Sequence, residues 1–138
     1  MDKALNYLSL ARKAGLAELG EEPVGAITRA LKGRLVIVAS DASDHTWRRA
    51  KSFVAGTDQQ CIRVSYTKDD LGMAVGRQSL AILALTDAAM AASFVKALPD
   101  TAKFADVTAK LEEKAAKLKQ RKDEAKAHQR NVRFGKKK

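Results

Sequence analysis

The sequence predicts a three-layer α/β domain followed by a basic helical extension. Segments of helical periodicity alternate almost strictly with short apolar runs, which is typical of a sheet covered by helices. The run Leu35-Val36-Ile37-Val38-Ala39 has no polar face and therefore indicates a strand buried on both sides. From Thr101 to about Ala127 the chain has neither glycine nor proline and keeps one thin apolar stripe, which predicts the helical extension.

Two helices around a short strand are predicted before the central strand. Apolar residues recur every three positions within residues 3–14, and Gly15 is placed to end that helix. Residues 16–19 alternate too briefly to form more than a short strand. The next helix begins at acidic residues and Pro23, which suit a first turn because of the helix dipole and the fixed φ of proline. We expect it to reach about Leu31 and to bury that side chain.

The remaining elements of the domain follow the central strand. Turn and cap residues precede each helix, and glycine or proline follows. The helices are expected over residues 46–55, 68–75 and 87–98, and the strands over residues 61–64 and 80–85. Pro99 closes the domain, so the chain divides into a domain of residues 1–98 and a tail of residues 99–138. The periodicity fades after Leu118, and we expect the end from Arg130 onward to be disordered when free.

The charge of the chain is concentrated in the tail. Residues 1–98 contain 13 basic and 10 acidic side chains, so +3, whereas residues 99–138 contain 13 basic and 6 acidic, so +7. Such an excess favours polyanionic partners. The single cysteine suits a reducing cytosol, and no apolar run approaches the ~20 residues of a membrane span. We therefore expect a cytoplasmic protein without a membrane partner, and a monomer.

Catalytic and metal-binding patterns are weak in this sequence. His45 and His128 lie far from any nucleophile motif, and Cys61 sits in an apolar strand where a buried, inert thiol is the common case. Trp47 is expected to pack in the core, with base stacking as the alternative. The sequence therefore predicts a non-enzymatic protein without a cofactor or metal. An RNA-modifying enzyme and a membrane-surface protein are weaker alternatives.

Two loops are the candidate binding sites. Ligands of α/β domains gather at loops on one edge of the sheet, and both Gly20-Glu21-Glu22 and Gly76-Arg77-Gln78-Ser79 connect a strand with a helix. Free N–H groups at the helix start could accept a phosphate, but the two glutamates oppose an anion. Because a carboxylate accepts hydrogen bonds from base-edge amino groups, this loop favours base reading over phosphate binding.

The order of these motifs resembles a known family. The resemblance covers residues 3–98 and is carried by the segments Leu10–Gly15, Gly20–Glu22, Leu35–Ser43 and Tyr66–Arg77. It is to the kink-turn-binding ribosomal proteins, the large-subunit "seven-Ae" group, and to their bacterial YlxQ-like members. The resemblance implies an α/β/α sandwich with a four-stranded mixed sheet, and RNA binding without catalysis or cofactor. It also implies RNA contacts from residues 20–23 with Ala26, and from residues 75–79.

The sequence departs from the family at the first loop. Family members that read kink-turns carry Gly-x-Asn-Glu and a lysine three residues later, whereas this chain has Glu22, Pro23 and Ala26 at those positions. Basic and polar residues nearby could supply other contacts. The candidate RNA-binding residues of the domain are Gly20, Glu21, Glu22, Arg29, Gly76, Arg77, Gln78 and Ser79.

The tail completes the expected function. Its candidate phosphate contacts are Lys119, Arg121, Lys122, Arg130, Arg133, Lys136, Lys137 and Lys138. We expect a ribosomal or ribosome-associated protein that recognises structured RNA, with specificity from the domain and affinity from the tail. The alternative is a protein-interaction module that docks through the apolar stripe from Phe104 to Leu118.

Overall fold

A four-stranded mixed sheet forms the centre of the fold. The computed structural model describes the backbone of residues 2–134 and the side chains of residues 2–129. The strands are β1 (Ala17–Leu19), β2 (Leu35–Val38), β3 (Gln60–Arg63) and β4 (Ile82–Leu85), in the spatial order β1-β4-β2-β3. Strand β4 is antiparallel to both β1 and β2, whereas β2 and β3 are parallel. The predicted sheet is therefore confirmed.

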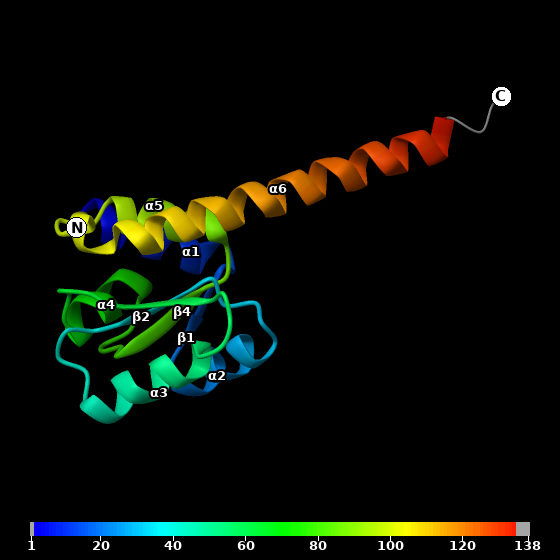
Figure 1. The fold of residues 1–138 in the computed structure, drawn as a ribbon. Coiled ribbons are helices and arrows are strands. Elements are labelled where there is room, and N and C mark those ends of the chain that lie inside the picture. The colour runs from blue at the N-terminus through cyan, green and yellow to red at the C-terminus, as the bar shows by residue number, and fades with distance from the viewer. Residues whose placement is uncertain (1, 135–138) are drawn as a thin grey trace.

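Helices cover both faces of this sheet. Figure 1 shows α2 (Glu21–Arg29) and α3 (Asp44–Val54) on one face. The other face carries α1 (Lys3–Lys13), α4 (Lys68–Val75) and α5 (Ala88–Lys96), with α1 packed against both α4 and α5. A 3₁₀ turn (Thr101–Phe104) then leads into α6 (Ala105–Phe134), which packs along α5. This is the predicted three-layer α/β/α sandwich with a helical extension.

The core lies on both sides of the two central strands. Every residue of β2 and β4 is buried, as expected for strands that read as continuous apolar runs. The apolar core does not stop at Pro99, because Leu111 of α6 is only 2% exposed and belongs to the same cluster. Phe104 and Val107 also pack against this cluster. The first half of the stripe predicted for α6 therefore covers the protein's own domain rather than a partner.

The end of α2 corrects one sequence prediction. The helix ends at Arg29, and Leu31 has a φ of 59° and a side chain 57% exposed instead of the predicted buried position. The backbone N–H of Lys32 donates to the carbonyl of Ile27, so the chain reverses through a left-handed residue. Thr28 takes the buried place, and its hydroxyl donates to the Val24 carbonyl at 2.9 Å.

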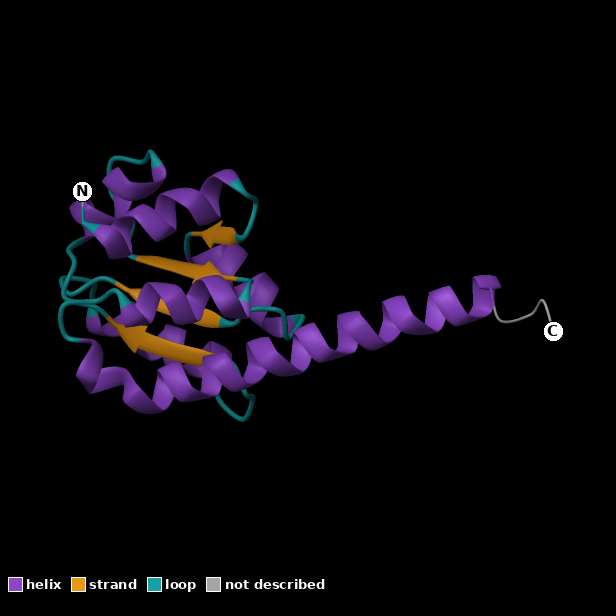
Figure 2. Cartoon of the chain, turned by 90° about the horizontal axis from the view of Figure 1, so that it is seen from above, coloured by secondary structure: helices purple, strands orange, loops and turns teal. Residues whose placement is uncertain are grey.

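Helix α6 is longer than predicted. It continues to Phe134, whereas we expected the chain to be disordered from Arg130 onward when free. Residues 135–138, including the three predicted contacts Lys136, Lys137 and Lys138, lie outside the described residues. The side chains of residues 119–129 are exposed, and the C-terminal part of the helix projects outward from the body (Figures 1 and 2). We call residues 119–134 the arm.

Candidate RNA interface

The two loops predicted to bind RNA lie at the same edge of the sheet. Strands β1 and β4 are antiparallel, so the end of β1 pairs with the start of β4, and Leu19 faces Leu83. The backbone N–H of Gly20 donates to the carbonyl of Ile82 at 3.0 Å. The segments 20–23 and 76–79, which are more than fifty positions apart in sequence, are thereby held at neighbouring ends of paired strands.

A third loop joins them at this edge. Strand β2 is also antiparallel to β4, and the N–H of Ala39, just after β2, donates to the carbonyl of Ala81, just before β4, at 2.9 Å. The turn at residues 40–43 therefore ends beside the other two loops. We call the surface formed by residues 20–23, 40–43 and 76–79 the loop edge. It includes the carboxyl ends of β1 and β2, where α/β folds commonly bind ligands.

The loop at residues 76–79 is held firmly by α4. Gly76 ends the helix in the left-handed conformation with a φ of 79°, and the N–H of Arg77 donates to the carbonyl of Gly72 at 2.8 Å. A Cβ at Gly72 would lie 2.8 Å from both the Arg77 carbonyl oxygen and the Ser79 nitrogen. Because the loop packs directly on the backbone of Gly72, its own side chains point away from the helix. Arg77, Gln78 and Ser79 are all exposed.

The start of α2 offers fewer free groups than the sequence indicated. Gly20 precedes the helix with a φ of 99° and has no side chain to cap it, while Pro23 removes one N–H donor from the first turn. Glu21 forms an ion pair with Arg49 of α3. Glu22 is exposed. Of the two glutamates, Glu22 is therefore the better placed to accept hydrogen bonds from a base edge.

The turn at residues 40–43 has a structural role. The carboxylate of Asp41 accepts a hydrogen bond from the N–H of Lys68 at 2.8 Å and so caps the start of α4. The guanidinium of Arg63 donates to the Ala42 carbonyl at 2.6 Å. The side chain of Ser43 caps α3, as expected for a residue just before a helix. These bonds tie the turn to β3, α3 and α4.

Helix α3 contributes basic side chains that the sequence analysis did not single out. Arg48, Arg49 and Lys51 are all exposed, and the ion pair between Arg49 and Glu21 places α3 beside the loop edge. The guanidinium of Arg49 also lies 5.3 Å from the ring centre of Phe53. The adjacent arginines were the available signal, but only the pairing of α2 with α3 shows which surface they join.

Trp47 is half-buried against the core. Lys51 and Arg63 both lie over its ring, with their charged atoms 5.3 Å and 5.7 Å from the ring centre. Because these cations lie over the ring, where a base would stack, the geometry favours the predicted packing role over base stacking.

Arg29 lies apart from the loop edge. It is the last residue of α2, about 12 Å along the helix from its start. A guanidinium nitrogen reaches back to 3.3 Å from the position of a Cβ on Gly25. This exposed cation therefore extends the basic surface along α2 instead of joining the two loops.

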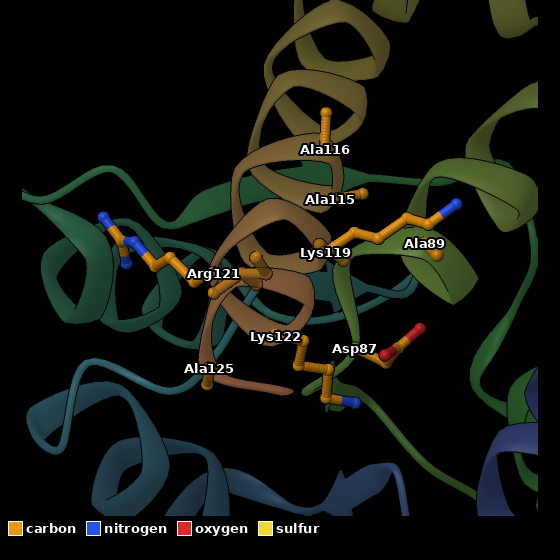
Figure 3. Close-up of a pocket in the computed structure, with 10 residues that line it drawn as sticks. Asp87, Ala89, Ala115, Ala116, Lys119, Arg121, Lys122 and Ala125 are labelled. Atoms are coloured by element: carbon orange, nitrogen blue, oxygen red, sulfur yellow. The ribbon is translucent and has the colours of Figure 1, made fainter. Parts of the chain in front are cut away.

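The tail residues lie far from the loop edge. Lys119, Arg121 and Lys122 are exposed on α6, and the backbone at Arg130 and Arg133 is helical. A groove of about 730 Å³ lies between the first residues of the arm and the start of α5, and half of the residues that line it are alanines of the two helices. Figure 3 shows Lys119 and Lys122 directed toward the side of Asp87 and Ala89, whereas Arg121 points to the other side of α6.

The titratable groups of the core are held in their neutral forms. Burial raises the pKa of the Cys61 thiol to about 12, so the thiol stays protonated at neutral pH. Burial and the hydrogen bond to Asp2 at 2.6 Å raise the pKa of Tyr66. Within residues 2–134, no group of three or more His, Cys, Asp or Glu side chains is arranged to hold a metal ion. No described helix is long and apolar enough to cross a membrane.

Comparison with known proteins supports the fold. The chain is similar to the structure of a protein of unknown function from Bacillus halodurans, with a TM-score of 0.65 and 26% sequence identity over 70% of this chain and 96% of that one. It is also similar to the 15.5 kD RNA-binding protein of Giardia lamblia, with a TM-score of 0.59 and 16% identity over 79% of this chain and 84% of that one. No protein-family model and no curated protein matches the sequence. The fold thus resembles that of an RNA-binding protein.

Proposed function

We propose that this protein binds structured, kink-turn-like RNA without catalysis, as a ribosomal or ribosome-associated accessory protein. It acts as a monomer and uses no cofactor. The domain contacts are Gly20, Glu21, Glu22, Arg29, Gly76, Arg77, Gln78 and Ser79, and the basic side chains of α3 join them. The arm adds phosphate contacts.

The position of Gly20 beside Ile82 carries this proposal. The hydrogen bond from the Gly20 N–H to the Ile82 carbonyl brings together two loops that the resemblance assigned independently to RNA binding. Both loops are backed by buried strands, so their exposed side chains are presented on a rigid support. The fold shared with the Giardia RNA-binding protein supports the same class of partner.

The chemistry of the loop edge suits recognition of bases beside a phosphate backbone. Arg77 can pair with phosphate or with the acceptors of a guanine edge, and Gln78 has both donor and acceptor atoms. Glu22 accepts hydrogen bonds from amino groups of bases. Arg48, next to the Arg49 that pairs with Glu21, adds a further exposed positive charge on α3 in a chain that has Ala26 where the family carries a lysine.

A binding measurement with three variants tests the proposal. The full chain is titrated with a fluorescent kink-turn RNA and with a control stem in which the sheared G·A pairs are replaced by Watson–Crick pairs. Arg77→Glu should weaken kink-turn binding at least about tenfold, because it reverses a charge at the contact. Arg77→Lys keeps the charge, and Lys13→Glu makes the same change of net charge at the exposed end of α1.

The two control variants separate a local contact from a general charge effect. We expect Lys13→Glu to stay within about threefold of the wild type and Arg77→Lys to lose less than Arg77→Glu. Equal losses from Arg77→Glu and Lys13→Glu would show that net charge alone drives binding. Equal affinity of the wild type for both RNAs would contradict kink-turn recognition.

A further inference from the structure

The loop edge and the arm lie at opposite ends of the molecule. Strand β4 starts beside Gly20 at the loop edge and ends at Leu85, and α5 begins three residues later at the far end of the sheet. The groove that Asp87 and Ala88 share with Leu118 shows that α6 passes this far end before it projects. Figures 1 and 2 show the arm continuing outward from that side.

The separation is large compared with a single short RNA stem. Helix α6 advances about 1.5 Å per residue, so Lys126 lies roughly 30 Å along the helix from its start at Ala105. The start of α6 lies at the end of the body opposite to the projecting arm (Figures 1 and 2), which is the end that carries the loop edge. A short stem bound at the loop edge therefore does not reach the middle of the arm.

The arm has the properties of a polyanion-binding surface. Residues 119–134 contain six basic and two acidic side chains, so +4. All side chains from residue 119 to residue 129 are exposed, and the apolar stripe of α6 ends at Leu118. Apart from the alanines that line the groove beside α5, this part of the helix offers a protein partner no apolar face to bury. Its charge instead complements a phosphate backbone.

A second, polar groove lies on the other side of α6, next to the first residues of the arm, and extends this surface; we call it the root groove. It has a volume of about 430 Å³ and lies between α6 and the residues before β3, with Lys110, Lys114, Lys117 and Arg121 along one wall. Lys114 pairs with Asp58 at 2.9 Å and Lys117 with Glu113 at 3.2 Å. Asp58 and Glu113 therefore offset part of the positive charge of this wall, while Lys110 and Arg121 have no ion pair among the described residues and Arg121 links the groove to the arm.

We propose that the arm and this root groove bind the phosphate backbone of a second RNA segment, separate from the one at the loop edge. The protein then acts as a bridge between two RNA segments rather than as one site with a nonspecific tail. This inference rests on the proposed function of the loop edge. It follows from the distance between the two surfaces, their opposite positions on the sheet and the polar character of the arm.

A two-RNA binding experiment tests the bridge. The first RNA is the shortest kink-turn fragment whose binding is weakened by Arg77→Glu. The second is an RNA hairpin with a stem of about six base pairs, which is shorter than about 20 Å because A-form RNA rises less per base pair than the ~3.4 Å of B-DNA. The two RNAs carry a donor and an acceptor dye. The full wild-type chain should bring them into one complex, seen as energy transfer that neither RNA shows alone.

Matched variants of the arm separate charge from shape. The neutral variant carries Lys119→Gln, Arg121→Gln, Lys122→Gln and Lys126→Gln, and the control carries Lys119→Arg, Arg121→Lys, Lys122→Arg and Lys126→Arg. Both keep good helix formers at every position. The neutral variant should lose at least tenfold more affinity for the second RNA than for the first. The control should recruit both.

The other outcomes overturn the proposal in distinguishable ways. If the neutral variant loses the first RNA as strongly as the second, the arm and the loop edge act on one RNA. If the neutral variant still recruits the hairpin, the arm is not the second site. If a poly-glutamate peptide binds the wild-type arm and the hairpin does not, the partner is an acidic protein. If no fragment is sensitive to Arg77→Glu, the proposed function itself fails.

Discussion

At the scale of single residues, Gly72 determines the shape of the candidate RNA loop. It lies inside α4 and is buried. Residues 77–79 pack directly on its backbone. The sequence could not show this requirement, because it arises from a close approach between a helix and a loop and leaves no periodic signal.

Gly72→Ala is expected to disturb both stability and RNA binding. The added methyl group would lie 2.8 Å from backbone atoms of Arg77 and Ser79, so the loop must move. We expect the free energy of unfolding to fall by about 1–3 kcal/mol, as for overpacked cores, and RNA affinity to fall with it. Urea denaturation and RNA titration measure the two effects. Met73→Ala, at a neighbouring exposed position, should change stability by less than about 0.5 kcal/mol, and an equal loss in both variants would contradict the role of Gly72.

Because of Cys61, the free energy of unfolding should fall as pH rises in the alkaline range. The pKa of the Cys61 thiol is about 12 when folded because of burial, compared with 9.0 for an unperturbed thiol. Above pH 9 the unfolded chain therefore loses a proton that the folded chain keeps, so this contribution is complete below pH 9 and falls as pH rises toward 12. The slope approaches about 1.4 kcal/mol per pH unit.

The variant Cys61→Ala isolates this effect. Urea denaturation at about pH 8 and about pH 11 should show a smaller loss of unfolding free energy in the variant than in the wild type, by about 2 kcal/mol. The Tyr66 contribution remains in both proteins and cancels in the comparison. Identical losses would mean that the thiol is ionised as easily in the folded chain as in the unfolded one.

At the scale of elements, the two halves of α6 behave differently. Leu111 is 2% exposed and lies in the domain core, whereas Leu118 is half-buried at the groove beside α5. Leu111→Ala should therefore lower the free energy of unfolding by about 2–5 kcal/mol, and Leu118→Ala by clearly less. Chemical denaturation of both variants checks this order. Equal small effects would show that α6 is not anchored to the domain.

The positions of the elements were largely predictable from sequence. The apolar runs that became β2 and β4 are buried on both sides, as their lack of polar residues indicated, and Thr67 caps α4 as expected. The errors lie where tertiary contacts override local pattern. Leu31 fits a helical stripe by spacing, but α2 closes through a left-handed residue and turns it outward. Helix α6 extends to Phe134 because the composition after Leu118 is polar yet contains no helix breaker before Gly135.

At the scale of the whole molecule, most of the net positive charge lies away from the loop edge, which is the candidate surface for reading RNA bases. The sequence assigned +3 to residues 1–98 and +7 to residues 99–138, but it did not show where these charges lie in space. The structure places the loops 20–23 and 76–79 together at one end and the arm at the other. The topology of the sheet is responsible, because β4 runs antiparallel to β1 and carries the chain from the loop edge to the opposite end.

This arrangement explains which candidate site residues could be predicted from the sequence and which could not. Glu22, Arg77 and Gln78 were predictable as an exposed group once the loops were recognised. The basic residues of α3 were not, because their relevance depends on the pairing of Arg49 with Glu21 across two helices. A hydrogen bond or an ion pair between distant segments has no counterpart in local sequence pattern.

Crosslinking with mass spectrometry tests the central claim most directly. The full chain is bound to the kink-turn RNA used above, irradiated and digested, and the crosslinked peptides are identified. We predict crosslinks in residues 20–23 and 76–79 and in α3, and we expect those of the loops to disappear with the control stem. Crosslinks confined to α6 with either RNA would contradict recognition by the loop edge.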